Sequence, residues 1–154
     1  MRLSEELQVV PVLALADHQA GIVGDSINGG KVHRIMFVLE TATLTGDAVL
    51  RVYSGATDAA ETTAETFRYR RADGDVNAAG SDQYGAWATS SALTLTAATY
   101  DNGVLIVEID MDELTDGQPW VTLDVSAAAT AFNATCVAIC TPRIEAHDTG
   151  TVLT

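Results

Sequence analysis

The stretch from Val104 to Arg143 decides the fold: VLIVEID, MDELTDGQ, PWVTLDV and, after a loop, TCVAICTPR. In the first segment Leu105, Val107 and Ile109 share one face, and in the third Val121, Leu123 and Val125 alternate with Trp120, Thr122 and Asp124. A period of two residues is typical of a β-strand. Between them, Asp110 is a good N-cap, Glu113 follows as in a capping box, and Gly117 can adopt the left-handed conformation that ends a turn. The stretch therefore predicts three strands, one short helical turn near 110–116 and a loop.

The rest of the chain repeats this strand pattern at short intervals. Apolar or alternating runs bounded by turn residues predict further strands at 7–16, 31–40, 47–54, 67–71 and 92–96. The run at 31–40 is apolar on both faces, which favours a central strand, and we expect the run at 47–54 to pair with it. Six to eight short strands without a long helix indicate an all-β fold, an antiparallel β-sandwich or barrel.

The N-terminal segment differs from the rest of the chain. We expect residues 1–19 to form an extended arm or an edge strand, and residues 20–154 to form a single β-sandwich domain. Pro11 cannot donate a ladder hydrogen bond, which excludes a central strand. An exposed apolar row would aggregate, so the segment must pack on its own sandwich or on a neighbouring chain. The predicted interface residues in it are Val9, Val10, Val12, Leu13 and Leu15.

Length, charge and cysteine usage limit the partners and the compartment. A chain of 154 residues is long enough for one domain with a real core. The net charge of −13, with one Lys and seven Arg, opposes contact with nucleic acid. No run approaches the ~20 apolar residues of a membrane span, and Glu5 and Glu6 stand where a secretion signal needs positive charge. Cys136 and Cys140 are expected to be buried thiols in a reducing compartment.

Motifs for nucleotides, metals and catalysis are incomplete. GIVGDSINGGKV departs from a phosphate loop, because a Gly takes the place of the Lys and a strand follows. Asp73, Asp75 and Asn77 open like a calcium loop, but Ala78 and Tyr84 replace its Gly and its bidentate Glu, so a solvated turn is the better interpretation. Calcium binding there stays an open alternative.

The side chains that could serve catalysis are scattered along the sequence. His18, His33 and His147 have no partner at a metal-ligand spacing, and no local signature marks a nucleophilic Ser. We therefore predict no enzymatic activity, no cofactor and no metal.

Aromatic and basic residues are the remaining candidates for binding. Trp87 and Trp120 could stack on sugars, although core packing or a subunit interface is the commoner role for a tryptophan in such a chain. Arginines among so many acids favour ion pairs or interfaces. Trp120 and Arg143 therefore join the predicted interface residues.

The same residues carry a resemblance to small structural proteins of tailed bacteriophages. It lies in VEID (Val107–Asp110), DEL (Asp112–Leu114), Gly117, WVTLDVS and the closing Pro142 and Arg143. Upstream it includes VHRIMFVLE, TGDAVLRVYSGATDA, TFRYRR, an acidic Gly-rich loop and YGAWAT. The resemblance covers residues 20–145 as a pattern of strands and corners.

The resemblance implies a virion protein made in the bacterial host cytoplasm. It would be a jelly-roll-like capsid decoration or cement protein on the outer capsid surface, with the major capsid protein as partner and a homotrimer as its assembly. The N-terminal segment suits strand addition to a neighbour, so deleting residues 1–16 is expected to abolish trimerisation or capsid attachment while the sandwich stays folded. Two alternatives remain: a carbohydrate-binding sandwich that uses Trp87, Trp120 and the loop at 72–83, and a head-completion or tail component.

Overall fold

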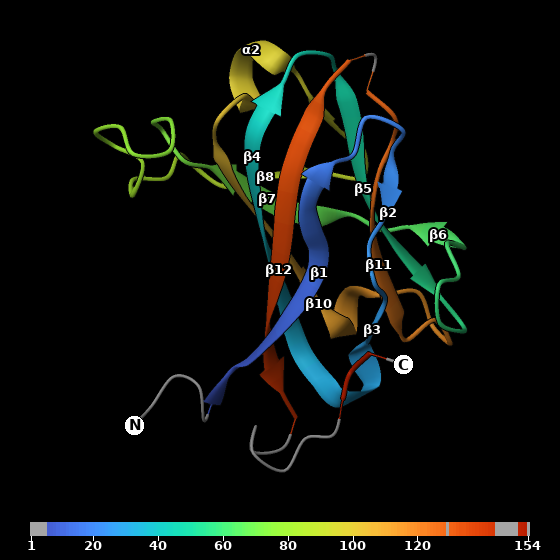
Figure 1. Cartoon of the computed structure of the whole chain (residues 1–154). Coiled ribbons are helices and arrows are strands. Elements are labelled where there is room, and N and C mark those ends of the chain that lie inside the picture. Colours follow the sequence, from blue (N-terminus) through green and yellow to red (C-terminus); the bar gives the residue numbers. More distant parts are fainter. Residues whose placement is uncertain (1–5, 129, 144–150, 154) are drawn as a thin grey trace.

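The computed structural model describes residues 6–128, 130–143 and 151–153. Its elements are β1 (Gln8–Asp17), β2 (Ile22–Val23), β3 (Ile27–Asn28), η1 (Gly29–Lys31), β4 (Val32–Leu44), β5 (Ala48–Gly55), β6 (Thr63–Ala64), β7 (Phe67–Arg71), β8 (Ala88–Ser90), β9 (Leu93–Leu95), α2 (Ala97–Tyr100), β10 (Val104–Asp110), η2 (Met111–Glu113), β11 (Trp120–Val125) and β12 (Phe132–Pro142). They form two antiparallel sheets that pack face to face (Figure 1). The predicted all-β sandwich is confirmed.

The strand pairing is that of a jelly roll, a long hairpin rolled into two sheets. Sheet A has the order β1-β12-β4-β10-β7-β8, and sheet B has the order β2-β11-β5-β6 with β3 on β11 and β9 on β5. The pairs are nested along the chain: β1 with β12, β2 and β3 with β11, β4 with β10, and β5 with β9. β7 and β8 lie outside this nest and widen sheet A beyond β10.

The expected pairing of the strand at 31–40 with the strand at 47–54 is wrong. β4 lies in sheet A between β12 and β10, whereas β5 lies in sheet B on β11. The turn residues Thr45 and Gly46 carry the chain across the sandwich instead of back along the same sheet. The central position predicted for β4 is correct, and its outward-facing Met36 and Val38 are half-buried.

The core fills the space between the sheets with side chains from alternate strand positions. Phe37 on β4 stands opposite Ala138 on β12 and Val107 on β10, and all three are fully buried. Phe67 and Phe132 are also almost completely buried. Burying one such ring stabilises the fold by roughly 1.5–3 kcal/mol.

β1 is an edge strand of its own sandwich. It pairs with β12 from Gln8 to Asp17, and its register shifts on both sides of Leu13. These shifts bring Leu13, as well as Val10 and Val12, into the core, which explains the weak alternation of the segment. Removing β1 would uncover the core, so we do not expect the sandwich to stay folded without residues 1–16.

The corner after β10 is a 3-10 turn, close to the predicted helical turn. Gly117 has the expected left-handed conformation, with φ of 78°. The capping box is absent, because the Asp110 side chain makes no cap hydrogen bond. It instead accepts hydrogen bonds from Nε and Nη2 of Arg34 at 2.5 and 3.1 Å. The corner is therefore fixed to β4 by an ion pair.

Several short elements were not predicted. β2, β3, β6 and β8 have two or three residues each, and α2 is a single turn. Elements this short show no periodicity in sequence. In the described part of the chain, no helix combines the length and the hydrophobicity that a membrane crossing requires.

Candidate functional site

The outer face of sheet A carries apolar side chains where a water-facing sheet usually carries polar ones. Laterally paired residues point to the same side of a sheet, and two such rows run across β1, β12 and β4. One row is Val9, Ile139 and Met36, and the other is Pro11, Val137 and Val38. Val9 is 64% exposed and Val137 37%. These six residues are called the apolar half of the face.

The same face becomes cationic on β7. The guanidinium carbon of Arg70 lies 4.5 Å from the ring centroid of Trp87 and 4.9 Å from that of Tyr84. The guanidinium carbon of Arg68 lies 4.8 Å from the Trp87 centroid. Arg68, Arg70, Tyr84 and Trp87 are called the cationic half.

Strand alternation explains how the cationic half forms. In FRYRR, Phe67 and Tyr69 point inward, so Arg68 and Arg70 point outward. β8 pairs with β7 through Tyr69 and Ala88, which brings the preceding Trp87 beside the two arginines. The loop between β7 and β8 therefore starts and ends at neighbouring positions of sheet A.

The stacking has electrostatic and chemical consequences. Each guanidinium over an aromatic face gains about 0.5–1 kcal/mol at an exposed site. Nε of Arg70 is buried and has no hydrogen-bond partner among the described residues. A stacked guanidinium still presents N–H groups in its plane, and these fit carboxylates in particular. The cationic half can therefore hold an acidic group of a partner.

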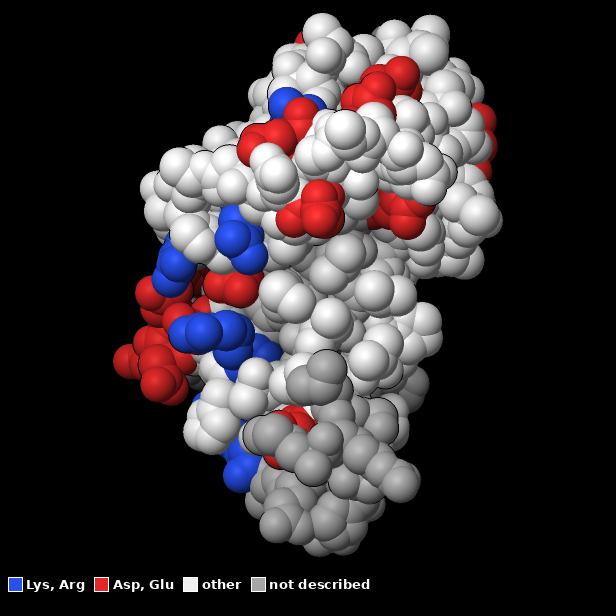
Figure 2. Space-filling view, turned by 90° about the vertical axis from the view of Figure 1, so that its left-hand side faces the viewer, with Lys and Arg blue, Asp and Glu red and all other residues white. Residues whose placement is uncertain are grey.

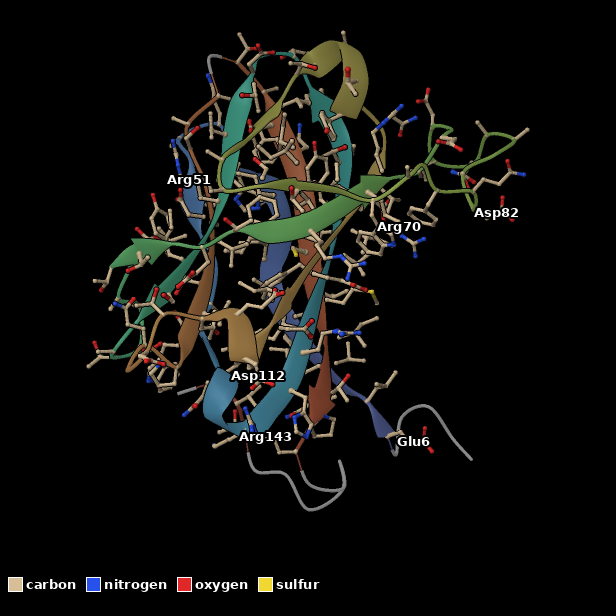
Figure 3. The ribbon with its side chains drawn as sticks, turned by 180° about the vertical axis from the view of Figure 1, so that it is seen from behind. Glu6, Arg51, Arg70, Asp82, Asp112 and Arg143 are labelled. Carbon is tan, nitrogen blue, oxygen red and sulfur yellow. The ribbon has the colours of Figure 1, made fainter. Side chains whose placement is uncertain are left out.

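Figure 2 faces the side of the molecule on which this charge pattern is seen. Basic side chains gather toward one margin, acidic side chains lie beside and above them, and a broad neighbouring surface is uncharged. Figure 3, from behind, places Arg70 on the sheet at the base of a projecting loop and Arg51 on the far side of the molecule.

Of the five predicted interface residues in the N-terminal segment, some are buried in the core and others are exposed. Val10, Val12 and Leu13 are 3%, 7% and 4% exposed and belong to the core, whereas Val9 and Leu15 are 64% and 73% exposed. This leaves two of the five N-terminal residues free to contact a partner.

The other two predicted interface residues lie elsewhere in the fold. Trp120 is half-buried on β11 of sheet B. Arg143 follows β12 and donates from Nε to the carbonyl of Val32 at 2.9 Å. Neither residue belongs to the outer face of sheet A.

The two tryptophans proposed as a sugar platform do not form one site. Trp87 precedes β8 in sheet A, and Trp120 lies on β11 in sheet B. Arg68 and Arg70 already stack on the Trp87 ring and occupy surface that a sugar would use. The geometry gives the carbohydrate alternative no support.

The calcium-like segment forms part of the projecting loop. Asp73 donates its backbone N–H to the carbonyl of Gln83, and Ala78 donates to the carbonyl of Asp75. Asn77 has φ of 66°, which is typical of a tight turn. Across the described ranges, no three His, Cys, Asp or Glu side chains come together as a metal site would require.

The histidines and cysteines that could have served chemistry lie apart. His18 is buried with Nε2 3.0 Å from the carbonyl of Ala14, His33 is exposed on β4, and His147 lies outside the described residues. Cys136 and Cys140 are buried and free on β12. Burial raises the pKa of each thiol to about 12, so the reactive thiolate is suppressed.

A buried carboxylate, Glu65, ties the corner loop to sheet B. Its Oε1 accepts hydrogen bonds from the Ser54 hydroxyl at 2.5 Å and from the Thr115 backbone N–H at 2.9 Å. Burial raises the pKa of Glu65, but these hydrogen bonds outweigh it, and the net pKa is below its ordinary value. The role of this group is structural, because it is enclosed by the loops that it joins.

Replacing Glu65 by Gln is expected to destabilise the fold by about 1–1.5 kcal/mol at pH 7, since the neutral amide oxygen accepts these hydrogen bonds more weakly than the carboxylate does. A lowered native pKa means that the carboxylate contributes fully above its unfolded pKa, and that this contribution is lost as the pH falls through the native value. The difference between wild type and Glu65→Gln should therefore shrink below about pH 4. Urea unfolding at pH 7, 5 and 3.5 measures it.

Glu61→Gln is the matched control. Burial and then the charge of Asp124 raise the pKa of Glu61, so its ionised form does not stabilise the fold. We expect this variant to be at least as stable as wild type at pH 7. An equal loss of stability in both variants would contradict the structural role of Glu65.

Sequence reasoning missed the cationic half and most of the apolar half. The alternation in FRYRR was visible, as was the doubly apolar character of β4. The stacking of Arg70 on Trp87 and Tyr84 could not be predicted, because a loop without periodicity separates Arg70 from the two aromatic residues. The pairing of β12 with β1 and β4 assembled the apolar rows from distant segments.

Comparison with known proteins supports the fold. No family model and no curated protein sequence matches this chain. In structure, the chain is similar to the SPBc2 prophage-derived protein YomS, with 10% identity and a TM-score of 0.50, over 86% of this chain and 94% of that one. It is also similar to a protein of Bacillus endospore appendages, described as disulfide-linked pili, with 12% identity and a TM-score of 0.48, over 90% and 89% of the two chains. The chain is thus an antiparallel β-sandwich that shares its fold with a prophage protein.

Proposed function

We propose that this chain is a non-enzymatic structural protein of a phage particle. In this proposal it acts as a capsid decoration or cement protein, made in the host cytoplasm. It binds the major capsid protein from outside, between capsid subunits, and associates with copies of itself.

The observation that carries the proposal is the apolar half of the outer face of sheet A. Val9 and Pro11 are exposed on the edge strand β1 and Val137 on the neighbouring strand β12, where contact with water is unfavourable. Covering them with another protein removes apolar area from water at roughly 25 cal/mol per Å². A rigid sandwich with such a face suits repeated docking on a shell.

The prophage origin of YomS gives additional support. That protein shares the fold of this chain and derives from a prophage, which is a source of phage particle proteins. The net charge of −13 is compatible with an outward-facing surface on a crowded particle.

The test is co-sedimentation of the purified protein with heads of the encoding phage or prophage, prepared without this protein. Saturable binding is expected. The double variant Val9→Asp with Val137→Asp should raise the Kd about tenfold or more, because a central apolar contact is worth more than about 1.4 kcal/mol. Circular dichroism checks that the variant is folded.

Val23→Asp is the matched control, because Val23 is 51% exposed but lies on β2 in sheet B. It should bind like wild type. Failure of wild-type protein to bind heads contradicts the proposal. Binding to a glycan array would favour the carbohydrate alternative, and a low copy number in the particle would favour the head-completion alternative.

A further inference from the structure

The loop between β7 and β8 projects from the sandwich beside the cationic half (Figure 1). Residues 73–83 contain three acids, Asp73, Asp75 and Asp82, and neither Lys nor Arg. At its base, Ala72 forms an isolated bridge with Tyr84. The loop is thus anchored at the sheet and acidic along its length.

The acids of this loop do not neutralise the arginines of their own chain. Figure 3 shows Asp82 at the outer end of the loop, far from Arg70 on the sheet. Within residues 6–128, 130–143 and 151–153, no ion pair joins Arg68 or Arg70 to a loop carboxylate, whereas Arg34 pairs with Asp110. Glu108 stands beside Arg68 in the register of β10 with β7, but no ion pair between them is formed among the described residues. Each copy therefore offers guanidinium N–H groups on the sheet and carboxylates on the loop.

We infer that the cationic half binds the acidic loop of a second copy of this chain. Loop carboxylates meet the in-plane N–H groups of Arg68 and Arg70, and the small loop side chains allow close approach to the Trp87 ring. The net charge of −13 opposes the association of two copies, so the contact rests on the local complementarity between the acidic loop and the arginines.

The same complementarity determines the geometry of assembly. Two cationic halves facing each other would repel, and so would two acidic loops. The contact is therefore heterologous, with the loop of one copy on the sheet of the next, and such contacts close into rings when the rotation permits. The inference specifies the self-association included in the proposed function. It does not need a capsid, so it can fail while capsid binding holds.

The experiment is light scattering of the purified full chain after gel filtration, in 50 mM and in 500 mM NaCl. An oligomer is expected at low salt. Its apparent Kd should rise at least about tenfold at high salt, because exposed charges are screened within roughly 10 Å at 0.1 M salt. A protein that remains monomeric at low salt overturns the inference.

Charge reversal locates the contact. Loop reversal combines Asp73→Lys, Asp75→Lys and Asp82→Lys, and sheet reversal combines Arg68→Glu and Arg70→Glu. Each variant alone should be monomeric, because both charges in its contact now have the same sign. The loop variant changes no residue of a sheet, so it remains informative if the sheet variant misfolds.

Mixing the two variants gives the sharpest result. The reversed loop complements the reversed sheet, and the native loop of one variant complements the native sheet of the other. Neither variant binds itself, so the mixture should form assemblies of alternating copies, with even numbers in any closed ring. A mixture that stays monomeric contradicts the loop-to-sheet contact.

The control reverses three exposed acids elsewhere: Asp25→Lys, Asp112→Lys and Asp116→Lys. It changes net charge as the loop variant does and should still assemble. If it dissociates equally, net charge alone governs association and the proposed contact is wrong. If wild type is monomeric and sheet reversal abolishes head binding, the cationic half faces the capsid, which also overturns the inference.

Discussion

Deletion of residues 1–16 is expected to abolish cooperative folding of the chain at 25 °C. Val10, Val12 and Leu13 are almost fully buried, and each stabilises the fold by roughly 1.5–3 kcal/mol. Their loss, together with the backbone pairing to β12, is comparable with the roughly 5–15 kcal/mol that stabilises a whole domain. Circular dichroism during urea titration and heating measures the result.

Val9→Ser with Leu15→Ser is the control for this deletion. Both side chains are exposed on β1, so stability should change by no more than about 0.5 kcal/mol per site. A deleted chain that unfolds cooperatively at the wild-type midpoint would show that β1 contributes nothing to the core. Loss of binding after the deletion would not, by itself, locate an interface in this segment.

Phe37→Ala is expected to destabilise the protein by about 3–5 kcal/mol, because truncation of a buried aromatic ring leaves a cavity. Phe37 is completely buried on the central strand β4, with β12 on one side and β10 on the other, so the site can collapse little. Chemical unfolding in urea gives the free energy of unfolding for comparison with wild type.

Val137→Thr provides the comparison on the opposite face of the same sheet. Val137 is 37% exposed, and Thr keeps the branched shape that strands favour. A change within about 0.5 kcal/mol is expected. Similar losses in Phe37→Ala and Val137→Thr would mean that the two faces of sheet A are not inner and outer as described.

The strands with a regular pattern could be predicted from sequence for a physical reason. β10 and β11 each turn one row of apolar side chains to the core, Leu105, Val107 and Ile109 on β10 and Val121, Leu123 and Val125 on β11. This imposes the period of two that the sequence shows. The alternation is weak in β1, because the register shifts beside Leu13 place the consecutive residues Val12 and Leu13 in the core. Periodicity alone cannot reveal a bulge.

Strand partners and the candidate site were harder to predict. A turn such as Thr45–Gly46 has the same composition whether the chain returns along one sheet or crosses to the other, so the β4–β5 pairing was misassigned. The cationic half depends on Trp87 returning to Arg70 after a long loop. That contact is a property of the tertiary fold, which local sequence patterns do not contain.

The nesting of β1 on β12 also bears on how the protein is made. Asp17 accepts a hydrogen bond from the backbone N–H of Phe132, which lies 115 residues away in the chain. A ribosome releases the first strand long before its neighbour has been synthesised. Topologies dominated by such distant contacts fold slowly, so in a nascent polypeptide the apolar side chains of β1 stay without their partner strand until β12 has been synthesised.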